Sequence, residues 1–118
     1  MILSHQVCHA PGAVRVLLSG ELDMAVQEEL HDVLHAAVAG SAGVTEVDLR
    51  HVTFLDCAVI GELVGAYLDA RGRGQVLVVA QPQGFIRQVL ELTRVLALLT
   101  SRPAGLTASL IGPVTADG

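Results

Sequence analysis

The sequence has 118 residues, of which 52% are hydrophobic and 16% are charged, so it predicts one compact domain rather than a disordered chain. Its net charge of −5 and aromatic content of 3% count against direct nucleic-acid binding, because an acidic surface repels phosphates and single strands need aromatic stacking partners. The sequence carries no secretory signal pattern, no membrane-length apolar run and only two cysteines. We therefore expect a cytoplasmic protein that does not bind membranes.

The first half of the sequence predicts a hairpin, a helix and a further strand. Residues 3–9 and 13–18 are rich in β-formers and are separated by a Pro-Gly turn, which predicts an antiparallel pair. Asp23 is a candidate N-cap for a helix whose apolar residues recur at helical spacing up to Gly40. Residues 44–49 predict the next strand.

The second half continues the alternation of helices and strands. Asp56 precedes a second helix with one expected apolar face, formed by Ile60, Leu63, Val64, Tyr67 and Leu68. Residues 75–80 form an apolar run typical of a strand covered on both faces. Pro82 is expected to open a third helix.

The end of the chain gives weaker patterns. Residues 97–101 predict a short strand and residues 104–111 a helical turn, so the domain is expected to cover residues 1–112, with a tail at 113–118. The whole order predicts an α/β fold: a mixed sheet of four to five strands with an N-terminal hairpin, covered by three to four helices.

The most informative segment for function is Val52 to Gly61, expected between a strand and a helix. A helix N-terminus exposes free amides and the positive end of the helix dipole, so a small side chain there is rigid, accessible and suited to carrying an added anion. This would make Cys57 a good position for a switch. A structural alternative stays open, in which Asp56 only caps the helix and Cys57 is a small first-turn residue.

Four segments in this order resemble the STAS family, named for sulphate transporters and anti-sigma-factor antagonists. They are Gly20-Glu21-Leu22-Asp23, the strand at 44–49, Val52-Thr53-Phe54-Leu55-Asp56, and Gln88-Val89-Leu90-Glu91-Leu92-Thr93. The resemblance implies a STAS-like fold and a partner-switching function. The domain would bind an anti-sigma factor, which can be a serine kinase, and so free a sigma factor. In the family, phosphorylation of a Ser directly after the motif Asp ends the complex.

The sequence departs from this pattern at the phosphoacceptor. Antagonists of this type read Asp-Ser-Ser-Gly, whereas this chain reads Asp56-Cys57-Ala58-Val59, so we expect no phosphorylation at Cys57. The resemblance implies a partner-binding surface at Asp23, Thr53, Asp56, Cys57 and Ala58. Three consequences stay open: a constitutive antagonist, a partner bound without a kinase cycle, or a different switch at Cys57.

Several alternatives concern the hydroxyl and thiol groups. Thr53 is either a substitute phosphoacceptor or a residue that fits β structure. A helix N-terminus favours a reactive thiolate at Cys57, which neighbouring Asp56 disfavours, so a thiol redox sensor is a rival function. A Cys8–Cys57 disulfide would require the two residues to be adjacent in space. A scaffold subunit of a signalling assembly is another rival, and the sequence leaves homodimer formation open.

The sequence predicts neither an enzyme nor a cofactor. It contains no recognisable arrangement of acid, base and nucleophile. His31 and His35 have the i, i+4 spacing that can chelate zinc, but no third ligand is apparent in the sequence. We therefore interpret these histidines as part of a solvated helix face and predict no metal site.

Overall fold

The computed structural model describes residues 3–92, which form four strands, three α-helices and one 3₁₀ helix. In chain order the elements are β1 (Ser4–Ala10), β2 (Ala13–Leu22), η1 (Met24–Val26), α1 (Gln27–Ala39), β3 (Val44–Leu55), α2 (Cys57–Gly72), β4 (Val76–Ala80) and α3 (Gly84–Leu92). The predicted alternation of strands and helices is confirmed over this range.

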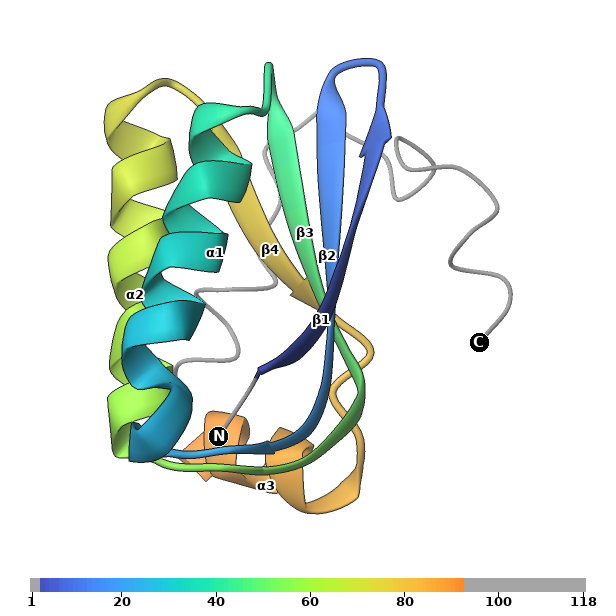
Figure 1. Ribbon diagram of the computed structural model, residues 1–118, viewed down its shortest axis with the longest axis vertical. Coiled ribbons are helices and arrows are strands. Elements are labelled where there is room, and N and C mark those ends of the chain that lie inside the picture. Colours follow the sequence, from blue (N-terminus) through green and yellow to red (C-terminus); the bar gives the residue numbers. More distant parts are fainter. Residues whose placement is uncertain (1–2, 93–118) are drawn as a thin grey trace.

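The four strands form one mixed sheet in the order β1-β2-β3-β4 (Figure 1). β1 and β2 pair antiparallel, and Gly12 in the turn between them has a φ of +74°, which a glycine adopts without strain. β2 pairs parallel with β3, and β3 pairs parallel with β4. The predicted mixed sheet with an N-terminal hairpin is therefore confirmed.

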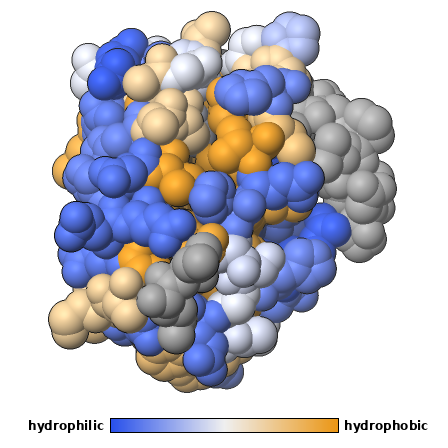
Figure 2. Space-filling model, viewed as in Figure 1, coloured by the Kyte–Doolittle hydropathy of each residue, from blue (hydrophilic) through white to orange (hydrophobic). Residues whose placement is uncertain are grey.

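The helices are unevenly placed around the sheet. α1 and α2 pack against each other on one face, while α3 lies across the end at which β2 and β3 finish (Figure 1). Hydrophilic side chains dominate over α1, and hydrophobic ones surface between α1 and the β1–β2 hairpin (Figure 2). None of the helices between residues 3 and 92 combines the length and the hydrophobicity that a membrane span needs.

The main core lies between the sheet and the α1–α2 layer. Alternate strand residues such as Val16, Val47 and Leu77 face the helices and are completely buried. β4 is buried on both faces, as expected, because Val78 packs with Ala13 and Val44 in a second cluster on the opposite face.

The face opposite α1 and α2 also buries a group of charges. Arg15 is 0% exposed, and its guanidinium contacts the carboxylates of Glu46 and Asp48 on the neighbouring strand β3. The Arg15 Nε–Glu46 Oε1 distance is 3.3 Å, and Asp48 Oδ1 also accepts a hydrogen bond from the backbone N–H of Arg50 at 2.8 Å. Buried carboxylates need such partners, because an unpaired charge is costly to remove from water.

Both central strands are longer than predicted. β3 continues to Leu55 instead of ending at Leu49, so the segment expected to connect a strand to a helix is itself strand. The β2–β3 pairing tolerates this length by shifting register twice, and the second shift leaves Thr53 as the extra residue opposite Gly20–Glu21. Gly20 adopts a φ of +88° at this point, which a residue with a Cβ adopts only at a cost.

Two details of the helices were predicted wrongly. Leu68 is 56% exposed, because α2 turns Val59, Ala66 and Ala70 inward along with Ile60 and Leu63. The third helix begins at Gly84 rather than Pro82, after Gln81 takes a left-handed φ of 59°. The predicted elements at 97–101 and 104–111, and the boundary between residues 112 and 113, lie outside the described residues.

Candidate functional site

The candidate surface forms where two parallel strands end and two helices begin. Asp23 follows β2, and its Oδ1 accepts a hydrogen bond from the N–H of Ala25 at 2.9 Å. Its predicted capping role is confirmed, although the capped turn is the 3₁₀ helix η1 that leads into α1. Carboxyl ends of parallel strands are common positions for binding sites, because the connecting loops converge there.

Asp56 holds the two halves of this surface together. Its Oδ1 accepts the N–H of Val59 at 3.1 Å and so caps α2, as the sequence predicts. Its Oδ2 accepts the N–H of Met24 at 3.0 Å, 32 residues away in the chain. A single carboxylate thereby fixes the start of α2 against the start of η1, and both of its oxygens are occupied.

The other predicted site residues follow Asp56 or precede it closely. Cys57 is the first residue of α2 and its thiol is free and exposed, while Ala58 beside it is half-buried. Thr53 is exposed and lies within β3. Thr53, Asp56, Cys57 and Ala58 are close because they are neighbours in the chain. The fold adds Asp23 to this group, because the residue after it, Met24, donates a hydrogen bond to Asp56.

Exposed hydrophobic side chains lie next to these residues, a feature that the sequence analysis missed. Met24 is 70% exposed, and Phe54, two residues before Asp56, is 40% exposed. Hydrophobic groups that stay in water next to polar ones are typical of protein-binding surfaces. We call Asp23, Met24, Phe54, Asp56 and Cys57 the carboxyl-edge surface.

The two cysteines of the chain lie at opposite ends of the sheet. Cys8 pairs with Arg15 near the β1–β2 turn, whereas Cys57 follows the carboxyl end of β3 (Figure 1). Both thiols are free. The spatial adjacency that a Cys8–Cys57 disulfide requires is therefore not present.

A second polar cluster lies between α1 and α2. His31 Nδ1 lies 2.7 Å from Glu62 Oε1, and Gln27 Nε2 donates to Glu62 Oε2 at 3.1 Å. His35 Nδ1 lies 2.9 Å from Asp69 Oδ2. The sequence indicated the two histidines but not these partners, which α2 supplies.

This cluster changes the acidity of both α2 carboxylates. Burial raises the pKa of Glu62, but hydrogen bonds from Gln27 and His31 and the charges of His31 and His35 outweigh it, so the pKa lies below its ordinary value. Hydrogen bonds from His35 and then Arg73 lower the pKa of Asp69. Both groups are therefore anionic at neutral pH.

A hollow connects this cluster to the carboxyl-edge surface. It has a volume of about 280 Å³ and is lined by Met24, Gln27, Glu28, His31 and Glu62. The hollow is shallow and open to solvent, so its shape fits a protruding side chain of a partner better than an enclosed small molecule.

A mixed sheet with an N-terminal hairpin, two helices on one face and an exposed helix N-terminus defines a small α/β domain. The chain belongs to the STAS family, since the family model described as "Mlab, STAS domain" matches residues 5–100. The fold class expected from the sequence and the resemblance are both confirmed.

Solved structures agree with this assignment. An anti-sigma factor antagonist from Mycobacterium paratuberculosis has 25% sequence identity and a TM-score of 0.76, and the match covers 88% of each chain. The unphosphorylated form of the anti-sigma factor antagonist SpoIIAA has 19% identity and a TM-score of 0.62, covering 75% of this chain and 83% of SpoIIAA. The phosphorylated form of the Bacillus cell fate determinant SpoIIAA has 17% identity and a TM-score of 0.66, and the match covers 86% of this chain and 93% of that one.

Proposed function

We propose that this protein is an anti-sigma factor antagonist that binds an anti-sigma factor through the carboxyl-edge surface and so frees a sigma factor. Its membership of the STAS family and its 25% identity to a solved antagonist over 88% of both chains support this function. The proposal assigns no catalytic step to the chain and places it in the cytoplasm. A kinase is one form that the anti-sigma factor can take.

The observation that carries the proposal is the exposure of Cys57 at the start of α2. Two further exposed side chains belong to the segments that meet here, Met24 through its hydrogen bond to Asp56 and Phe54 at the end of β3. A partner that covers this point buries hydrophobic area and reaches the free amides of the first turn of α2 at once. A stable interface needs about 800 Å² on each partner, so contacts beyond these residues are part of the proposal.

The residues of the surface divide by role. The carboxylates of Asp23 and Asp56 accept backbone N–H groups, so we assign them to fixing the shape of the surface. Cys57, Met24 and Phe54 have exposed side chains, so we assign direct contact to them.

The residues at the start of α2 also bear on how the proposed antagonist is regulated. SpoIIAA has been solved in phosphorylated and unphosphorylated forms, whereas position 57 of this chain carries a thiol and position 58 no hydroxyl. We infer an antagonist that is not switched off by phosphorylation at Cys57. Thr53 is exposed and keeps a hydroxyl, but it occupies the register shift of β3 and we assign it a structural role.

The test is a pull-down from lysate of the source organism with wild-type protein and the Cys57→Glu variant as baits, followed by mass spectrometry. Glu is well tolerated in the first turn of a helix, so the variant should fold while placing a negative charge on the surface. We expect an anti-sigma factor with the wild type and at least a tenfold weaker recovery with the variant. Rebinding of the purified pair then gives the change in affinity directly.

Ala36→Glu is the matched control, because Ala36 is exposed near the C-terminal end of α1, away from the carboxyl-edge surface. This variant should bind like the wild type. Equal binding by Cys57→Glu would contradict the proposed surface, and recovery of other signalling proteins without an anti-sigma factor would favour a scaffold subunit. A loss of binding after mild thiol oxidation, reversed by reductant, would instead favour a redox role for Cys57.

A further inference from the structure

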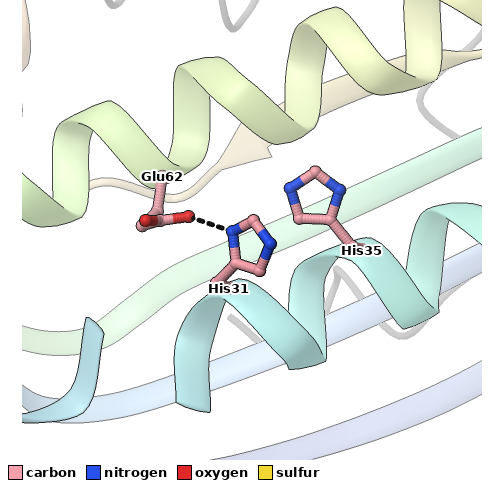
Figure 3. A group of neighbouring side chains, drawn as sticks. All are labelled: His31, His35 and Glu62. Atoms are coloured by element: carbon pink, nitrogen blue, oxygen red, sulfur yellow. Dashed lines mark hydrogen bonds and ion pairs between the residues drawn. The ribbon is translucent and has the colours of Figure 1, made fainter. Parts of the chain in front are cut away.

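Two histidines of α1 and one carboxylate of α2 meet at the surface between these helices (Figure 3). His31 and His35 are one turn apart, and their ring centroids lie 4.2 Å from each other. One ligand atom from each of His31, His35 and Glu62 lies within 4.8 Å of the other two. The antagonist function proposed above assigns no role to this cluster.

The three side chains have the chemistry of a transition-metal site. Two imidazoles and a carboxylate are a common set of zinc ligands, with water in the fourth position. Histidines at i and i+4 on one helix can bind the same ion. With metal–ligand bonds of about 2.0–2.1 Å, tetrahedral donors lie about 3.3 Å apart, which side-chain rotation reaches from the observed separations.

Neighbouring residues orient two of these ligands. Asp69 Oδ2 lies 2.9 Å from His35 Nδ1, which leaves His35 Nε2 free to bind a metal. Asp69 is itself held by Arg73, whose Nε donates to Asp69 Oδ1 at 3.1 Å. Gln27 donates to Glu62 Oε2, which leaves Glu62 Oε1 on the side of His31. Such outer partners fix ligand rotamers and are a regular part of metal sites.

The cluster is also accessible and suitably charged. His31 has a side-chain exposure of 51%, and the hollow beside it opens to solvent, so a hydrated ion can enter. The His31–Glu62 hydrogen bond of 2.7 Å holds a proton between the two groups, and a cation would take the place of this proton.

We propose that His31, His35 and Glu62 form a binding site for a divalent cation of the zinc class, with Asp69 and Gln27 positioning the ligands. The bound ion would tie α1 to α2. The hollow that Met24 lines together with His31 and Glu62 joins the two sites, so the metal site borders the carboxyl-edge surface without sharing a residue with it.

The experiment titrates tag-free protein with Zn²⁺ by calorimetry and with Co²⁺ by visible absorption. We expect one ion per chain and the intense absorption of four-coordinate Co²⁺. His31→Ala, His35→Ala and Glu62→Gln should each weaken binding about 100-fold, and Asp69→Asn about 10-fold. Zn²⁺ should also raise the unfolding temperature of the wild type and not that of His35→Ala, since a ligand that binds only the folded state stabilises it.

Two control variants separate this site from ordinary surface groups. Asp32→Asn removes an exposed carboxylate next to His31, and His51→Ala removes an exposed histidine of β3. Both should bind Zn²⁺ like the wild type. The proposal is overturned if Co²⁺ stays six-coordinate, if Glu62→Gln binds as tightly as the wild type, or if Asp32→Asn loses as much affinity as Glu62→Gln.

Discussion

At the scale of single residues, Asp56 links two segments of the chain through one carboxylate. Its carboxylate accepts one N–H at the start of α2 and another at the start of η1, while Asp23 accepts only one. Replacing a capping side chain with Ala costs about 1 kcal/mol, and a second hydrogen bond to a carboxylate contributes a similar amount.

We therefore predict that Asp56→Ala lowers the free energy of unfolding by about 2 kcal/mol, and Asp23→Ala by about 1 kcal/mol. Urea denaturation followed by circular dichroism measures both. Asp56→Asn retains one acceptor oxygen and should fall between the wild type and Asp56→Ala. Equal losses for Asp23→Ala and Asp56→Ala would show that the hydrogen bond to Met24 contributes nothing.

These values also matter for binding studies of the carboxyl-edge surface. A variant of Asp56 that loses a partner could do so because the start of α2 has moved and not because a contact was removed. Cys57→Glu avoids this ambiguity, since no hydrogen bond described above depends on the Cys57 side chain.

At the scale of elements, the glycines of the site region have opposite requirements. Gly20 has a φ of +88° in β2, where a Cβ would meet no atom within 4 Å but the backbone conformation is unfavourable for other residues. Gly61 lies inside α2, is exposed, and has open space around it. The first glycine is required by the backbone, and the second is not.

Gly20→Ala should therefore destabilise the protein by about 1–2 kcal/mol, whereas Gly61→Ala should stabilise it by about 0.5–1 kcal/mol. The midpoints of chemical denaturation, measured side by side, check both values. A stabilising effect of Gly20→Ala would mean that the register shift of β2 relaxes in solution.

At the scale of the whole molecule, stability depends on the buried charges on the sheet face opposite α1 and α2. Arg15 is completely buried against Glu46 and Asp48, so removing it leaves two buried carboxylates without their shared guanidinium. Breaking a buried ion pair from one side is usually far more costly than removing a surface charge.

Arg15→Met should lower the free energy of unfolding by about 3–5 kcal/mol. Arg71→Met makes the same chemical change at an exposed position in the last turn of α2, and it should stay within about 0.5 kcal/mol of the wild type. Thermal and urea unfolding of the two variants provide the comparison. A loss below about 1 kcal/mol for Arg15→Met would mean that the carboxylates find other partners.

What the sequence predicted well was local. The capping roles of Asp23 and Asp56, the hairpin, and the order of strands and helices follow from residues close together in the chain, and the structure confirms them. These features depend on side chains that contact their own backbone two or three residues away.

What the sequence did not predict depends on contacts between distant segments. The hydrogen bond from Met24 to Asp56 spans 32 residues, and the approach of Glu62 to His31 spans 31. α2 is apolar on most of its surface, so its sequence does not reveal which side faces the core; this led to the error at Leu68. The register shifts that extend β3 arise from pairing with β2 and have no local signal.

The shared acceptor at Asp56 has a consequence for motion. The amides of Met24 and Val59 give their hydrogen bonds to the same carboxylate, so rotating that side chain away releases both helix starts together. The two segments should then exchange their amide hydrogens as one cooperative unit, at a common rate, although they are far apart in sequence. A partner that clamps either segment would thereby slow the opening of the other.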